Sequence, residues 1–229
     1  MRIAIVTAAL LATVGLSTPA HAEPTASGIE VGLRTGYAIP LGSAVGGGTN
    51  GSGDLSKAIS GDVPIWVDAG YRFPNLYIGG FFQYGIGFVP SSASSTSGAT
   101  CGQNGVSCST SDIMLGVDAH YHFLPGGPID PYVGLGVGYE ILNAKASGGG
   151  QSASESVTGF QFVNLQVGAD YKAMPNLGIG PFVMMSFGQY SGCSYSGAAT
   201  AEGSCSIQQQ AVHEWLTLGV RGAYDINLF

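Results

Sequence analysis

Charged side chains are unusually scarce in this sequence. Asp, Glu, Lys and Arg together make up 9% of its 229 residues, whereas a soluble globular domain carries roughly 25% charged residues. Lysine occurs only at Lys57, Lys145 and Lys172. The net charge of −7 comes without any basic patch, which a protein needs to bind the nucleic-acid backbone. The composition therefore argues against a nucleic-acid partner and against an ordinary soluble surface.

Long apolar runs are also few. A basic start, an apolar run over 3–16 and the motif Ala-His-Ala at 20–22 predict a secretory signal peptide that is cleaved between Ala22 and Glu23. This run is shorter than the roughly 20 residues that a helix needs to cross a bilayer, and no run near that length follows it. If the mature chain lies in a membrane, only a closed β-barrel remains.

The sequence lacks the paired C-x-x-C spacings and the nearby histidines that are typical of a zinc site. Its four cysteines form two local pairs in Ser/Gly-rich segments, Cys101 with Cys108 and Cys193 with Cys205. An exported chain meets oxidising conditions, so each pair is predicted to form a disulfide within a loop. Other pairings remain open at this stage.

Eight segments alternate with a period of two residues, one parity being apolar and the other small or polar. This pattern predicts eight β-strands. They span 29–37, 62–73, 76–88, 112–123, 132–142, 163–172, 177–190 and 215–229. Pro181 interrupts the seventh, and proline cannot donate to a strand ladder, so we expect it to mark a bulge or a strand end.

The connections alternate in length. Those at 74–75, 124–131 and 173–176 are short, whereas the other four are long and rich in Gly and Ser: 41–61, 89–111, 143–159 and 191–213. Outer-membrane barrels have short periplasmic turns and long extracellular loops, and an even strand number returns both termini to the periplasm. The sequence therefore predicts an all-β fold: an eight-stranded antiparallel up-and-down transmembrane β-barrel.

The same pattern predicts one structural domain. We expect a cleaved signal peptide at 1–22, a short segment at 23–27 and the barrel at 28–229. The barrel is expected to be monomeric, with outer-membrane lipids around it.

The polar parity is mostly Gly, Ala, Ser and Asn, which suits a narrow barrel interior. Isolated charges buried there cost several kcal/mol each, so they must be paired or hydrated. We therefore predict a charge network across the lumen that consists of Glu30, Arg34, Asp68, Arg72, Asp118, Glu140, Asp170, Lys172, Arg221 and Asp225. The interior glycines either leave a narrow passage or make room for Trp66, Tyr77, Phe81 and Phe182.

Two segments, PYVGLGVGYE at 131–140 and LQVGADYK at 165–172, and a last strand that ends at Phe229 resemble the small OmpA/OmpW-like outer-membrane barrels of Gram-negative bacteria. The resemblance implies insertion by the barrel-assembly machinery, which reads a terminal aromatic residue. Phe229 departs from the pattern, because the apolar parity of this strand runs through Ile226 and Leu228. Either Phe229 lies past the membrane edge or a bulge shifts the register.

Asp118, His120 and His122 lie on one face of a predicted strand, about 7 Å apart at each step of two residues. Two histidines at this spacing can chelate a metal. The favoured interpretation is a hydrogen-bond network near the periplasmic turn, and neither a metal nor a cofactor is expected.

No nucleophile motif such as G-x-S-x-G surrounds any serine, so catalysis is not expected. His213 and Glu214, near the outer end of the last strand, are the residues on which a lipid A-modifying or proteolytic barrel would depend. The preferred function is a structural role or a limited, porin-like passage or binding of small molecules. The alternative is adhesion or recognition through the disulfide-stapled loops.

Overall fold

The computed structural model describes residues 27–46, 53–90, 101–103, 105–197 and 200–227. The predicted signal peptide with its cleavage site at Ala22 and Glu23 lies outside the described residues. The terminal Phe229, on which the register question depends, also lies outside them.

Nine strands and one four-residue helix make up the described chain. The helix α1 spans Leu55–Ala58, and no helix in the described part of the chain is long and apolar enough to cross a membrane. The strands are β1 (Gly28–Gly42), β2 (Gly61–Arg72), β3 (Leu76–Phe88), β4 (Ser107–His122), β5 (Ile129–Gly148), β6 (Gln151–Met174), β7 (Leu177–Gly197), β8 (Thr200–Ser206) and β9 (Val212–Asn227).

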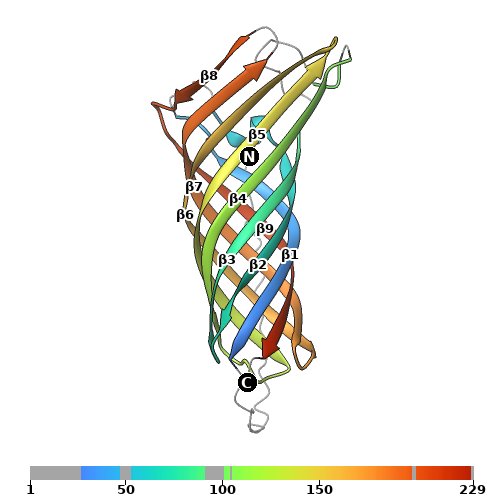
Figure 1. Cartoon of the computed structure of the whole chain (residues 1–229), viewed down its shortest axis with the longest axis vertical. Coiled ribbons are helices and arrows are strands. Elements are labelled where there is room, and N and C mark those ends of the chain that lie inside the picture. Colours follow the sequence, from blue (N-terminus) through green and yellow to red (C-terminus); the bar gives the residue numbers. More distant parts are fainter. Residues whose placement is uncertain (1–26, 47–52, 91–100, 104, 198–199, 228–229) are drawn as a thin grey trace, which may run out of the picture.

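Eight of these strands close into a ring (Figure 1). β1 to β7 pair in sequence order, and β9 pairs with β7 on one side and with β1 on the other. The closing ladder between β1 and β9 runs from Gly28 opposite Asn227 to Gly42 opposite His213. Every described pairing is antiparallel. The predicted eight-stranded antiparallel barrel is confirmed.

The two faces of the sheet have opposite character. Large apolar side chains point away from the ring, for example Leu115 at 64% and Val117 at 57% exposure, whereas Arg34 and Asp68 inside it are 2% and 1% exposed. A soluble barrel would place its apolar parity inward. This barrel is polar inside and apolar outside, as the alternation predicted.

Two ends of the barrel can be distinguished. The turns at 73–75, 123–128 and 175–176 lie at one end, called the turn end from here on. The other end, called the loop end, carries α1 and β8 (Figure 1).

Several predicted loops are strands in the structure. The predicted loop 143–159 is wrong, because β5 and β6 continue through it to a two-residue turn at Gly149 and Gly150. Both glycines have positive φ, 59° and 77°, as a tight hairpin turn requires. Here most side chains on both faces are exposed or half-exposed, so the sequence is polar on both parities and shows no period of two.

The predicted loop 191–213 is also largely strand. β7 extends to Gly197, and β8 folds back on it outside the ring, which gives a ninth strand that the alternation did not predict.

A bulge in β6 explains why the predicted sixth strand began too late. Phe160, before the register shift between Gln161 and Val163, and Phe162, within it, are even-numbered and point outward; after the shift, the odd-numbered Leu165 does so. The extra residue changes which parity faces the lumen. Because the outward-facing parity changes at this bulge, the alternation after it predicted the beginning of a new strand.

Pro181 does not mark a strand end. It lies within β7 and pairs with Val220 of β9. On the β6 side, the described partners are Ile179 and Phe182, with none at Pro181 itself. The missing N–H is thus accommodated by a local gap in one ladder rather than by ending the strand.

The close packing of the backbone around Gly219 can be tested by substitution. A Cβ there would collide with the Thr35 carbonyl oxygen and lie 2.8 Å from Cε1 of Phe182. We expect Gly219→Ala to lower the free energy of unfolding by about 1–3 kcal/mol, as overpacking does, in urea titrations of the lipid-reconstituted protein. Gly222→Ala is the control, because a Cβ there has nothing within 4 Å. Equal losses in both variants would contradict the packing described here.

Candidate functional site

The interior of the barrel is the candidate site, and its contents change along each strand. On β2, from the turn end to the loop end, the inward side chains run Arg72, Asp68, Trp66 and Asp62. The same order, from charge pairs through apolar groups to carboxylates, recurs on β4. The lumen is therefore layered.

Arg34 anchors one part of the charged layer. Its guanidinium donates to Asp68 on β2 at 3.0 Å and to Asp118 on β4 at 2.6 Å. It also donates to Gln166 on β6 at 2.7 Å. One arginine thus ties three other strands together across the lumen.

Glu30 links the other two arginines. It accepts hydrogen bonds from Arg72 on β2 at 2.6 Å and from Arg221 on β9. Arg72 also donates to Asp130 at 3.3 Å, and Arg221 donates to Asp170 at 2.6 Å. All five side chains are nearly inaccessible. Charge-assisted bonds of this kind are the strong class, and they satisfy groups that would otherwise be costly to bury.

These eight residues are called the arginine network: Arg34, Arg72, Arg221, Glu30, Asp68, Asp118, Asp130 and Asp170. Seven of them belong to the predicted lumen set. Asp130 was missed because it fell in a predicted turn, and its short distance in sequence from His122 was the available signal.

Three predicted members lie elsewhere. Lys172 and Asp225 pair with each other at 3.6 Å in partly exposed positions near the turn end. Glu140 belongs to a different group near the loop end, where it accepts from Tyr190 at 2.5 Å, His213 at 3.0 Å and Trp215 at 3.1 Å. The rings of Tyr190 and His213 stack with their centroids 4.0 Å apart, and this stacking holds the group together.

A cluster of large apolar side chains packs against the arginine network inside the lumen and is called the aromatic–methionine belt. Trp66 packs on Phe81 with ring centroids 5.5 Å apart, and the Arg34 guanidinium lies 5.1 Å from the Trp66 ring. Each member is at most 4% exposed. The belt consists of Trp66, Phe81, Met114, Tyr132, Phe182 and Met184.

Interior glycines make room for these rings. A Cβ on Gly116 would lie 2.5 Å from Cζ of Phe81, and one on Gly168 would lie 2.6 Å from the Tyr132 ring. Of the two interpretations of the glycines, space for side chains is the one that holds at these positions.

The metal candidates are held in separate interactions. His120 Nε2 contacts Asp118 at 3.1 Å, whereas His122 contacts Asp130 at 2.9 Å and Arg72 at 3.0 Å. No group of three or more His, Cys, Asp or Glu side chains within the described ranges has the geometry of a metal site. The arrangement matches a hydrogen-bond network near the turn end.

The residues of the enzyme alternative are not brought together. His213 is buried on Glu140 inside the lumen, whereas Glu214 lies on the opposite parity of β9.

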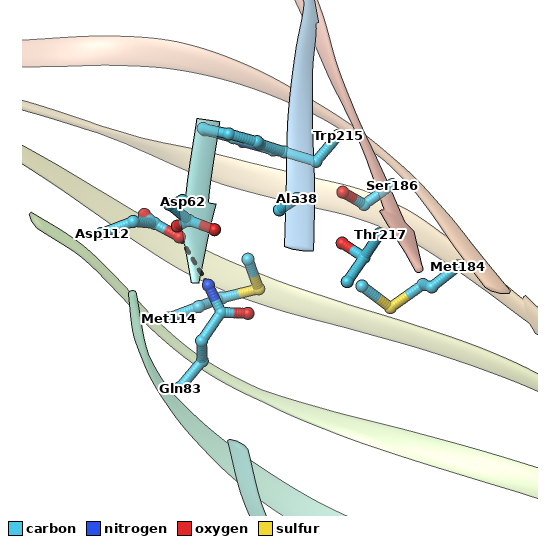
Figure 2. A pocket seen from close by; sticks show the side chains of 9 residues that line it. All are labelled: Ala38, Asp62, Gln83, Asp112, Met114, Met184, Ser186, Trp215 and Thr217. Atoms are coloured by element: carbon cyan, nitrogen blue, oxygen red, sulfur yellow. Dashed lines mark hydrogen bonds between the residues drawn. The ribbon is translucent and has the colours of Figure 1, made fainter. Parts of the chain in front are cut away.

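Two aspartates near the loop end were not predicted as site residues. Asp62 and Asp112 are each 1% exposed and line a small cavity of about 10 Å³ (Figure 2). Asp112 accepts a hydrogen bond from Gln83 at 2.6 Å. Their inward parity was readable from the sequence, but no nearby basic residue drew attention to them.

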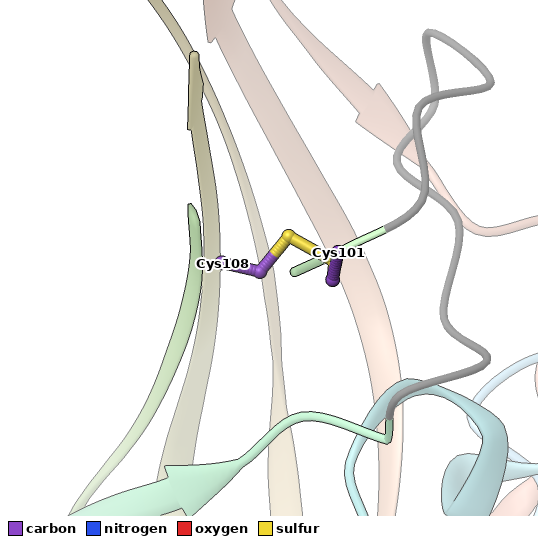
Figure 3. Close-up of a disulfide and its surroundings, with 2 residues drawn as sticks. All are labelled: Cys101 and Cys108. Carbon is purple, nitrogen blue, oxygen red and sulfur yellow. A yellow bond between two sulfur atoms is a disulfide. The ribbon is translucent and has the colours of Figure 1, made fainter. Parts of the chain in front are cut away.

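Both predicted disulfides are present. Cys101 bonds Cys108, with Cα atoms 5.6 Å apart (Figure 3). Cys193 and Cys205 are directly paired residues of β7 and β8 and are also bonded. Both bridges lie at the loop end of the barrel.

The sequence profile of the family described as outer membrane protein beta-barrel domain matches residues 8–181. The chain belongs to this family. It is a small outer-membrane β-barrel, and the family places it in the outer membrane of Gram-negative bacteria. No curated protein matches its sequence.

Solved structures agree on the fold of this outer-membrane barrel. Neisserial surface protein A is 16% identical, with a TM-score of 0.50; the match covers 88% of this chain and 99% of the other. A major outer membrane protein from Thermus thermophilus is 14% identical, with a TM-score of 0.59, and the match covers 87% and 99%. At such identities the likeness concerns the fold alone.

Glu30 is the common partner of two buried arginines, so its contribution to stability can be tested. Glu30→Gln removes one partner from both Arg72 and Arg221, and breaking buried pairs is costly, so we expect a loss of about 3 kcal/mol in the free energy of unfolding. Urea titration in lipid vesicles measures it. Lys172→Gln, at the partly exposed pair, is the control and should change stability by no more than about 1 kcal/mol. A Glu30→Gln protein as stable as wild type would show that the network is not what stabilises the interior.

Proposed function

We propose that this protein is a closed, non-conducting structural barrel that carries a rigid strand extension on the cell surface. In this proposal the turn end and both termini face the periplasm and the loop end faces outward. The barrel works as a monomer in outer-membrane lipid, after insertion by the barrel-assembly machinery. No catalytic step is assigned to it.

The filled lumen is the observation that carries this proposal. The arginine network and the aromatic–methionine belt pack against each other in the lumen, and their members are at most 5% exposed. The inward cavity near Asp62 has a volume of about 10 Å³, roughly the space of one water molecule. An eight-stranded barrel is normally just wide enough for side chains to fill it, and this composition supports closure rather than passage.

At the loop end, a second group of side chains closes the barrel. Leu55 of α1 and Ile59 just after it are 0% exposed and pack with Leu142, Tyr190 and Trp215. The segment between β1 and β2 therefore folds into the mouth of the barrel. A solute that entered from this side would first have to displace it.

Planar-bilayer recording tests closure. Because the charged layer and the belt leave no wide path, the wild-type protein is expected to give no reproducible conductance steps at moderate voltage. A general porin added to the same bilayer is the positive control, and heat-dependent gel mobility establishes that the tested protein is folded. Regular unitary steps that scale with the amount of folded protein would overturn the proposal and favour the passage of small solutes.

A groove at the loop end favours recognition as a second candidate function. It has a volume of about 530 Å³ and lies among β5, β6, β7 and β8. Tyr195 is 46% exposed there, with Glu155, Glu202 and several serine hydroxyls around it. An exposed ring among hydroxyl and carboxylate oxygens suits a hydroxyl-rich ligand such as a carbohydrate, because aromatic side chains anchor recognition sites.

An oligosaccharide array probed with the folded protein tests this candidate. If the groove binds sugars, Tyr195→Ala should weaken any positive signal by about ten-fold or more, the scale of a hot-spot aromatic. Lys145→Ala, a change on the same rim but outside the groove lining, should leave the signal unchanged. An array without signal, or equal loss in both variants, would remove the groove as a binding site.

A further inference from the structure

The small cavity near the loop end contains two buried carboxylates without a basic partner in its lining. Asp62 comes from β2 and Asp112 from β4, and each is 1% exposed. The lining contains no lysine, arginine or histidine. This differs from the arginine network, in which each carboxylate contacts an arginine.

Gly85 of β3 brings these two carboxylates together. It is paired with Asp112 on one side and lies two residues from Gly87, the partner of Asp62, on the other. A Cβ on Gly85 would collide with Oδ2 of Asp62 and lie 3.3 Å from Cβ of Asp112. Both acidic side chains therefore occupy the space above one glycine.

The opposite wall supplies an independent polar group. Ser186 of β7 is 1% exposed and lines the cavity, yet its Oγ has no hydrogen-bond partner among the described residues. Figure 2 shows Ser186 and Thr217 facing the two aspartates across the cavity. Both carboxylate oxygens of Asp62 and Oδ1 of Asp112 are likewise unpartnered within the described chain.

Such a set of groups is costly without a cation. Burying an ionised carboxylate without a compensating partner costs several kcal/mol, and two carboxylates close together also repel each other. The groups left over are all oxygens, the ligands of hard cations. We propose that this cavity binds one calcium-sized divalent cation, with Asp62 and Asp112 as the charged ligands and Ser186 on the opposite wall.

The charge and size of the site favour calcium over other ions. Two carboxylates balance two positive charges. Calcium accepts an irregular shell of side-chain oxygens, to which Thr217 and Gln83 of the lining can add, whereas magnesium demands near-octahedral geometry and usually keeps several waters, for which about 10 Å³ leaves no room. Met114 and Met184 also line the cavity, but thioethers select soft cations, and the unpartnered groups here are oxygens.

The cavity is covered on its loop side. Trp215 lines it and packs with Leu55 and Ile59 above it. An ion bound there is shielded from solvent, so we expect it to enter during folding and to exchange slowly. Trp215 also provides an optical reporter, because an indole next to a bound terbium ion transfers excitation energy to it.

The experiment uses the full mature chain folded in detergent with terbium, calcium or chelator present. Wild type folded with terbium should show tryptophan-sensitised emission that excess calcium present during folding prevents, and calcium should raise its Tm, because a ligand that binds only the folded state stabilises it. Trp215→Phe should lose most of the emission but keep the calcium-dependent rise in Tm. That pair of results locates the ion beside Trp215.

Asp62→Asn and Asp112→Asn test the ligands. Each should weaken calcium binding by roughly ten-fold or more, because the number of charged ligands sets calcium affinity. Both variants are expected to fold, since each removes an uncompensated buried charge. With chelator present, the Asp62→Asn variant should therefore have a higher Tm than wild type. With calcium present, this difference in Tm should shrink or change sign. Far-UV circular dichroism and heat-dependent gel mobility verify folding.

Glu155→Gln and Glu202→Gln, at the exposed groove of the loop end, are the matched controls and should bind calcium as wild type does. The proposal is overturned if wild type shows neither terbium emission nor a calcium-dependent Tm; the two aspartates would then share a proton or hold water. The proposal is also overturned if the two control variants lose the calcium-dependent rise in Tm while the Asp62→Asn variant keeps it.

Discussion

Closure of the strand ring by the ladder between β1 and β9 is the constraint on which the rest of this structure depends. A sheet with an apolar outer face and an unpaired edge would leave backbone N–H and C=O groups unsatisfied in lipid, where each costs several kcal/mol. The pairing of Gly28–Gly42 with the last strand removes both edges of the ring. Closure also encloses every polar side chain of the inward parity, so the interior has to solve its own charge balance.

The interior solves that balance differently at its two ends. Toward the turn end, three arginines neutralise a larger number of carboxylates through direct ion pairs, and these pairs cross the lumen between strands far apart in sequence. Near the loop end, Glu140 is satisfied by three neutral or weakly basic donors, whereas Asp62 has no partner from the described chain. The aromatic–methionine belt packs against the arginine network, with Trp66 paired with Arg34 and Phe81 with Asp68.

The membrane-facing part of the fold was predictable because its two faces meet different surroundings. Leu33 and Arg34 are neighbours in sequence, yet one is 56% and the other 2% exposed, and this contrast produces the period of two. The signal fails where the contrast ends. Ser154 and Glu155 on β6 have opposite parity, yet both are exposed, so nothing in their alternation indicated a strand, and the bulge at Gln161–Val163 changed the phase within an unbroken strand.

The sequence predicted which side chains lie in the interior better than it predicted which of them contact each other. Inward parity identified Glu30, Arg34 and Arg221, but which carboxylate each arginine contacts depends on strand tilt and side-chain length across the lumen. Asp130 lay in a predicted turn, and Glu140 was placed with arginines that it does not contact. The two disulfides were predicted from the short separation within each pair, and the structure decides among the pairings that the sequence left open.

The position of Glu30 has a consequence for how the barrel assembles. This carboxylate sits on the first strand, and its two arginine partners sit on the second strand and on the last one. While the chain is an open sheet, the pair with Arg72 can form between neighbours, but Arg221 cannot reach Glu30 until the last strand docks. Arg221 also pairs with Asp170 of β6, across β7, so this first carboxylate is within its reach before the ring closes, and docking of β9 on β1 adds Glu30 as the second one. Glu30 therefore gains its second arginine only when the first and last strands meet in the register that places it near Arg221, so the correct joining of the ring is favoured over a shifted one by a buried ion pair.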